Sequence, residues 1–182
     1  MPLLNTIASP YAEALLQITD QSGESELVAE QARQLLDLWQ LSPELRQSFV
    51  SPVIEPETKK AIVVALFQEQ VTPSFLNLLK LLADRQRISI LDSILDRFLV
   101  LFREQRHIAL ASVVSATPLS EDQQQALRVK VQALAGTENV EFKLDVDPSL
   151  IGGLIIRYGS KVIDASLSGQ VRRLGLALAK SG

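Results

Sequence analysis

Few side chains in this 182-residue sequence could carry out covalent or metal chemistry. There is no cysteine, and His107 is the only histidine, so one copy holds no thiolate and no multi-histidine metal site. Asp145 and Asp147 share one face of a predicted strand, where they could ligate a hard cation, although a solvated face has the same pattern. His107 follows a predicted helix, and we interpret it as a surface or capping residue.

The pair Gly152-Gly153 is the second candidate for chemistry, because glycines also build phosphate-binding loops. Such loops open a helix, whose N-terminus meets the phosphate. Here the pair opens a strand, and no Gly-Lys-Ser/Thr follows it. We therefore predict a structural role for the two glycines, either a close backbone approach or a bulge. The sequence predicts no enzyme, cofactor or metal site.

Composition and charge narrow the function classes further. The hydrophobic fraction is 47% and the net charge is −3, which argues against a chain that mainly binds nucleic-acid phosphates. No run approaches the ~18 apolar residues of a membrane span, and the first residues do not resemble a signal peptide. We expect a soluble, cytosol-facing protein. Five arginines suggest an acidic partner or nucleic acid, but interleaved carboxylates favour a solvated helix face: Arg85, Arg87, Arg97, Arg103 and Arg106.

Residues 1–105 predict an N-terminal bundle of six short helices, because apolar residues recur at helical spacing between Pro and Gly breaks. The first helix either begins at Pro10 with Ser9 as its cap or bends there. Ser42-Pro43 and Thr72-Pro73 are typical of helix starts. The apolar residues of the first and fifth helices are mostly core by default, but both helices are apolar over more than one face, which suggests an exposed groove for a partner helix. The residues in question are Ile7, Tyr11, Leu15, Phe75, Leu78, Leu79 and Leu82.

Residues 106–182 predict a small α+β domain with a mixed sheet of about four strands and two helices, so the fold class of the whole chain is α+β. We predict a strand from Ile108 to Ala116. Ser120 and Gln123 match a capping box at the start of a helix, and Gly136 ends that helix. Apolar and charged residues alternate strictly from Val140 to Asp147, which is the clearest strand pattern in the chain.

The segment IGGLIIRYGSKVIDASLSGQVRRL, residues 151–174, organises this second domain. A two-residue turn at Gly159-Ser160 predicts a hairpin of the II′ type. One face then carries Leu154, Ile156, Tyr158, Ile163 and Ala165. The other carries Arg157, Val162 and Asp164, with Arg157 and Asp164 as diagonal neighbours. Ser166 is the predicted N-cap of the last helix.

This segment resembles the C-terminal signature of the delta subunit family of F-type ATP synthase, the counterpart of the mitochondrial oligomycin-sensitivity subunit. The positions that carry the resemblance are Gly152, Gly153, Ile156, Gly159, Val162, Ile163, Asp164, Ser166 and Leu174. Ser160, Ala165 and Gln170 depart from the residues common in the family. The N-terminal half resembles the family too, around Pro10-Tyr11-Ala12 and Arg87.

The resemblance implies a non-catalytic stator subunit without a cofactor. The N-terminal bundle would hold N-terminal helices of the alpha subunits, and the second domain would hold one or two b-type stalk subunits. The protein would lie on the cytoplasmic side of an energy-transducing membrane, thylakoid or plasma membrane, without spanning it and without binding nucleic acid. The residues alone leave two alternatives open: a helical adaptor or regulatory module, and a nucleic-acid-binding domain.

Overall fold

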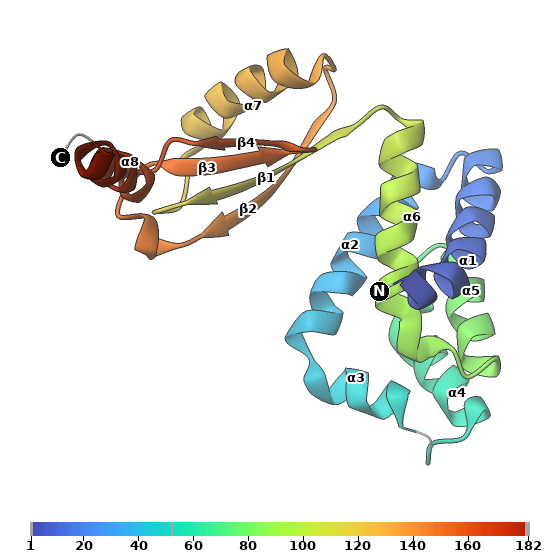
Figure 1. Cartoon of the computed structure of the whole chain (residues 1–182). Coiled ribbons are helices and arrows are strands. Elements are labelled where there is room, and N and C mark those ends of the chain that lie inside the picture. Colours follow the sequence, from blue (N-terminus) through green and yellow to red (C-terminus); the bar gives the residue numbers. More distant parts are fainter. Residues whose placement is uncertain (1, 52, 181–182) are drawn as a thin grey trace. The chain divides into compact units, whose positions relative to one another are not determined.

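The computed structural model describes the backbone of residues 2–51 and 53–180, and the side-chain burial of residues 6–51 and 53–173. The chain divides into two compact units, Met1–Glu104 and Gln105–Gly182, called unit 1 and unit 2 below (Figure 1). Helices and a four-stranded mixed sheet make it an α+β protein, which confirms the predicted class.

The regular elements described in unit 1 are all helices. Four of its helices have proline at their first position, where the missing N–H costs nothing. The elements are α1 (Pro2–Gln21), α2 (Ser25–Leu41), α3 (Pro43–Val50), α4 (Pro56–Phe67), α5 (Pro73–Asp84), the 3₁₀ turn η1 (Ile88–Ile90) and α6 (Leu91–Gln105).

Helix α1 runs through Pro10 instead of beginning there. Proline inside a helix removes one backbone hydrogen bond and costs about 3 kcal/mol. The buried stripe Ala8, Ala12 and Leu15 continues with helical spacing across that position, and all three are at most 3% exposed. Packing of this stripe offsets the lost hydrogen bond, and of the two alternatives the one in which the helix begins at Pro10 is wrong.

Aromatic residues from separate helices fill the core of unit 1. Phe49, Phe75 and Phe98 are at most 1% exposed. Trp39 of α2 stacks on Phe49 of α3, with ring centroids 5.9 Å apart. Such pairs contribute about 0.5–1.5 kcal/mol beyond their burial, so this pair stabilises the packing of α2 against α3.

Unit 2 is a four-stranded sheet in the order β2-β1-β3-β4 with α7 packed against one face (Figure 1). The central strand β1 pairs parallel with β2 and antiparallel with β3. Leu127 and Val131 of α7 join Val113 and Ile156 in the buried cluster. The elements are β1 (Ala109–Ser115), α7 (Glu121–Ala135), β2 (Val140–Val146), the 3₁₀ turn η2 (Pro148–Leu150), β3 (Leu154–Tyr158), β4 (Lys161–Asp164) and α8 (Leu167–Lys180).

The predicted capping box of α7 and its predicted end at Gly136 are confirmed, and the predicted strand from Val140 is confirmed only in part. Ser120 and Gln123 form the reciprocal capping box of α7, and Gly136 ends that helix in the left-handed conformation. Strand β2 lies where the alternation predicts it, but Leu144 and Val146 are 42% and 50% exposed. They lie on an edge strand beyond the part of the sheet that α7 covers, so alternation predicts their direction and not their burial.

Candidate functional site

The hairpin of β3 and β4 has the predicted register. Tyr158 pairs with Lys161 across the turn, and Ile156 pairs with Ile163. Gly159 has a positive φ of 54°, whereas Ser160 does not, which is the combination that a type II′ turn requires. Ile156 is buried against α7, and Arg157 and Val162 lie paired on the opposite, exposed face.

Gly152 and Gly153 bring the strand that follows them against the start of α8. The carbonyl oxygen of Gly152 accepts a hydrogen bond from the N–H of Leu167 at 2.9 Å. A Cβ on Gly152 would lie 2.7 Å from Leu167 Cδ1. A Cβ on Gly153 would collide with the carbonyl oxygen of Ala165, and the φ of Gly153 is +76°. Gly153 is therefore needed for close backbone approach, one of the two structural roles predicted for the pair, whereas at Gly152 the added Cβ would meet only the side chain of Leu167.

Asp164 and Ser166 cap the first turn of α8. The Asp164 Oδ1 atom accepts hydrogen bonds from Ser166 N at 3.0 Å and from Ser166 Oγ at 2.6 Å. Ser166 Oγ in turn accepts from the N–H of Gly169 at 3.0 Å, which confirms Ser166 as the N-cap. Ser166 is 1% exposed, so these bonds are shielded from water.

The charge of Asp164 is balanced by α8 itself. Its Oδ2 atom lies 3.5 Å from Arg172 and 3.7 Å from Arg173. The pKa of Asp164 is lowered, first by the hydrogen bond from the Ser166 side chain, then by the Ser166 backbone N–H, and less by Arg173 and Arg172. Arg157 is a diagonal neighbour of Asp164 in the strand register, as predicted, but the ion pairs described for Asp164 are those with the helix.

Gly169 belongs to the same cap, and sequence reasoning missed it. A Cβ there would lie 2.6 Å from Asp164 Oδ1 and closer still to Oδ2, so the carboxylate occupies the space that a side chain would need. The available signal was a glycine three residues after the N-cap, in a helix interior where glycine is otherwise unfavourable. The side chain of Leu174, another predicted signature residue, lies outside the residues whose side chains are described.

The other residues considered for chemistry have structural contacts. Asp147 Oδ1 accepts from Ser149 N at 2.9 Å, and hydrogen bonds from Ser149 lower the pKa of Asp147. His107 is exposed, and its carbonyl oxygen accepts from Thr137 Oγ1 at 2.8 Å. Among the described residues, no three His, Cys, Asp or Glu side chains are grouped closely enough to hold a metal ion.

In unit 1, the residues predicted to line a groove are mostly part of the core. Leu15 and Leu78 are 3% and 8% exposed, and the remaining three buried members are at most 1% exposed: Phe75, Leu79 and Leu82. These five side chains are core, as expected by default, and do not form an exposed groove in the free chain, because α5 packs against both α4 and α1. Ile7 is 44% exposed and Tyr11 is half-buried.

An apolar strip does remain exposed on α1, beside the buried stripe of the same helix. It consists of Ile7, Tyr11, Ala14 and Ile18, spaced by four, three and four residues, and is called the α1 strip below. Ile18 is 53% exposed. The hydroxyl of Tyr11 accepts a hydrogen bond from Arg87 at 2.8 Å, and the Arg87 guanidinium lies 5.8 Å from the Tyr11 ring centroid. Leu81 adds an exposed leucine on the neighbouring helix α5.

Comparisons with known proteins agree over nearly the whole chain. A model of the ATP synthase delta (OSCP) subunit family matches residues 7–178. The delta subunit of the organellar chromatophore ATP synthase of Paulinella chromatophora is 63% identical over 182 residues, all of both chains. ATP synthase subunit delta of Synechococcus sp. strain CC9902 is 61% identical over 181 residues and is also covered in full.

A solved structure shares the fold. A chain in the mitochondrial ATP synthase hexamer of Toxoplasma gondii, studied by cryo-EM, superposes with a TM-score of 0.72. The match covers 94% of this chain and 97% of that one, at 22% sequence identity. At this identity the match shows the fold alone.

Proposed function

The chain belongs to the ATP synthase delta (OSCP) subunit family, and from this premise we propose that it joins the alpha/beta catalytic head to the b-type helices of the peripheral stalk. The family is one of structural, non-catalytic subunits of the synthase. In the proposed role the chain turns over no substrate. It holds two stationary parts of the complex together against the torque of the rotor.

The head contact is proposed for unit 1, whose six helices act as a bundle that presents the α1 strip. An amphipathic N-terminal helix of an alpha subunit would cover Ile7, Tyr11 and Ile18, together with Leu81 of α5. The Arg87 hydrogen bond fixes the Tyr11 ring before binding, so little side-chain entropy is lost there. The buried residues Leu15 and Leu78 support this surface from beneath. The exposed α1 strip is the observation that carries the proposal.

The stalk contact is proposed for unit 2 and involves α8. Leu167 and Val171 lie one turn apart on this helix and are 47% and 65% exposed. The cap formed by Asp164 and Ser166 fixes the start of α8 on the hairpin, so a load on the helix is transmitted to the sheet. Two such units on one chain raise the effective concentration at the second site once the first is occupied. The bound state then outlasts many rotor cycles through slow dissociation.

The proposed location is the cytoplasmic side of an energy-transducing membrane. None of the described helices is both long and apolar enough to cross a bilayer. The relatives named above include a Synechococcus strain and a chromatophore, which supports a thylakoid or plasma membrane. The b-type subunits that attach the chain to that membrane would be either two copies of one b subunit or a b and b′ pair.

The test is coupled ATP synthesis in membranes carrying Ile18→Glu. Losing the burial of an exposed isoleucine costs about 2 kcal/mol, which is more than tenfold in head affinity. We expect loss of coupling with normal folding, because Ile18 is 53% exposed in the free chain. Leu15→Glu would be a poor test, since Leu15 is in the core.

Val100→Glu on α6 is the matched control, because Val100 is 38% exposed and lies off the α1 strip. Emission from Trp39, which is buried against Phe49, verifies that each variant is folded. If Ile18→Glu and Val100→Glu couple equally well, the α1 strip is not the contact with the head.

A further inference from the structure

Helix α2 carries a second exposed stripe that the proposed head contact does not use. It comprises Leu27, Gln31, Gln34, Leu38 and Leu41, spaced by four, three, four and three residues, and is called the α2 stripe below. This is the spacing of the seam between two helices in a coiled coil, where an occasional polar residue fixes the register. Its three leucines are 54%, 39% and 81% exposed, in chain order.

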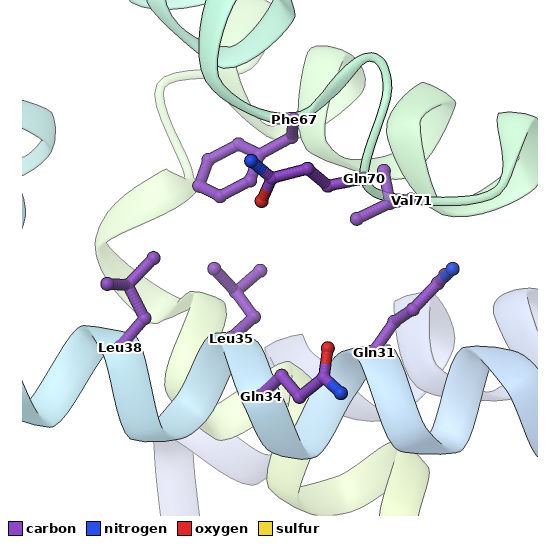
Figure 2. Close-up of a pocket in the computed structure, with 7 residues that line it drawn as sticks. All are labelled: Gln31, Gln34, Leu35, Leu38, Phe67, Gln70 and Val71. Atoms are coloured by element: carbon purple, nitrogen blue, oxygen red, sulfur yellow. The ribbon is translucent and has the colours of Figure 1, made fainter.

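The middle of the α2 stripe opens into a pocket. One wall is α2, and the other is the end of α4 with the segment before α5 (Figure 2). The floor is apolar and fixed, because Leu35 and Phe67 are 4% and 6% exposed. Leu38 and Val71 complete the apolar lining. A pocket of this composition accepts one apolar side chain from a helix lying along the stripe.

Glutamine amides form the rim of the pocket and are partly held in place. Gln31 Oε1 accepts from Thr72 N at 3.1 Å and from Thr72 Oγ1 at 3.3 Å. Gln34 Nε2 donates to Glu30 at 3.3 Å. Figure 2 shows the side chain of Gln34 lying along α2 on one wall and the amide of Gln70 beside the Phe67 ring on the other. These groups can satisfy polar atoms that a bound helix brings to the rim.

Charge around the α2 stripe selects the kind of helix. On a helical wheel, Glu26, Glu30 and Asp37 flank the stripe on the side away from the core. Glu69 is exposed just after α4, beside the residues of the second wall. The nearest cation on α2 is Arg33, which pairs with Glu30 at 3.2 Å. Acidic flanks along an apolar seam favour basic residues at the edges of the partner and disfavour acidic ones.

We propose that the α2 stripe and its pocket are a second docking site for a basic amphipathic helix of a partner protein. The site is on a different helix from the α1 strip, so each can be removed separately. An apolar side chain of the partner helix fills the pocket between Leu35 and Phe67. Lysine or arginine residues beside its seam lie against the carboxylates of α2.

The test uses the full chain and a labelled 18-residue helical peptide with leucines at seam positions and lysines beside them. A second peptide has glutamates in place of those lysines. Fluorescence anisotropy should show at least tenfold tighter binding of the lysine peptide. Leu38→Gln should weaken its binding about tenfold, whereas Leu134→Gln, which replaces an equally exposed leucine on α7 of unit 2, should have no effect. The double substitution Glu26→Gln/Asp37→Gln should weaken binding several-fold and reduce its salt dependence.

Three results would overturn the proposal. One is equal binding of the two peptides, which would remove the role of charge. Another is equal weakening by Leu38→Gln and Leu134→Gln, which would mean non-specific adsorption. The third is self-association of the chain that Leu38→Gln abolishes, which would assign the stripe to a second copy. Trp39 emission again verifies folding, because this residue faces the core and not the stripe. None of these measurements depends on ATP synthesis.

Discussion

Replacing Gly153 by alanine tests whether the close approach between β3 and the start of α8 holds unit 2 together. The backbone of Gly153 has a φ of +76°, which costs an alanine about 1–2 kcal/mol. The added Cβ would also collide with the backbone of Ala165, which is not a flexible side chain that could move aside. The segment must therefore shift.

That shift disturbs two backbone hydrogen bonds. Gly153 O accepts from Ala116 N at 3.1 Å, and Gly152 O accepts from Leu167 N at 2.9 Å. At about 1 kcal/mol each, their loss raises the total cost of Gly153→Ala to about 3–4 kcal/mol. Domain stability is about 0.1 kcal/mol per residue, so this is a large part of the stability of unit 2.

Gly136→Ala is the matched control, because Gly136 has a φ of +68° and nothing within 4 Å of the Cβ position. It should cost only the conformational strain of about 1–2 kcal/mol. In urea unfolding followed by far-UV circular dichroism, the midpoint of Gly153→Ala should lie roughly 1 M below that of Gly136→Ala. Trp39 emission, which reports only on unit 1, should not change. Equal midpoints for the two variants would refute the role of the close approach.

Three further outcomes concern the cap of α8. Ser166→Ala should destabilise unit 2 by about 1 kcal/mol in urea unfolding, because the Gly169 N–H loses its acceptor. Gly169→Ala should lower the unfolding midpoint, although alanine normally stabilises a helix, because its Cβ displaces the Asp164 carboxylate; a raised midpoint would contradict this. The pKa of Asp164 is below its ordinary 3.8, so its stabilising effect is present above that pH and is lost as the pH falls through 3.8 and below. Acid titration of unit 2 unfolding should therefore be less steep in Asp164→Asn than in the parent chain.

Local signals were predictable because their geometry depends on a few neighbouring residues. The capping box at Ser120, the hairpin turn at Gly159 and the N-cap at Ser166 each require particular side chains at fixed offsets. The strand register followed from the turn length. The α+β class followed from the spacing of apolar residues, which changes near residue 106 from the helical repeat to the two-residue repeat of strands.

Burial was less predictable, because it depends on helices that are distant in sequence. Leu15 and Leu78 have the same apolar character as Ile18 and Leu81, but only the latter pair is exposed. Helical spacing shows that a helix has two apolar faces and does not show which face a neighbour covers. Gly169 was missed for a similar reason, since its contact is with a carboxylate on the preceding strand.

The sheet of unit 2 ends in two strands that have no neighbour on one side, β2 and β4. Each is poorly suited to receive an extra strand. Strand β4 has only four residues and begins with Lys161, and β2 places Lys143 and Asp145 on its exposed face. Charged and short edges of this kind oppose polymerisation by backbone pairing. The sheet is therefore protected at both ends against open-ended stacking of one copy of the chain on the next.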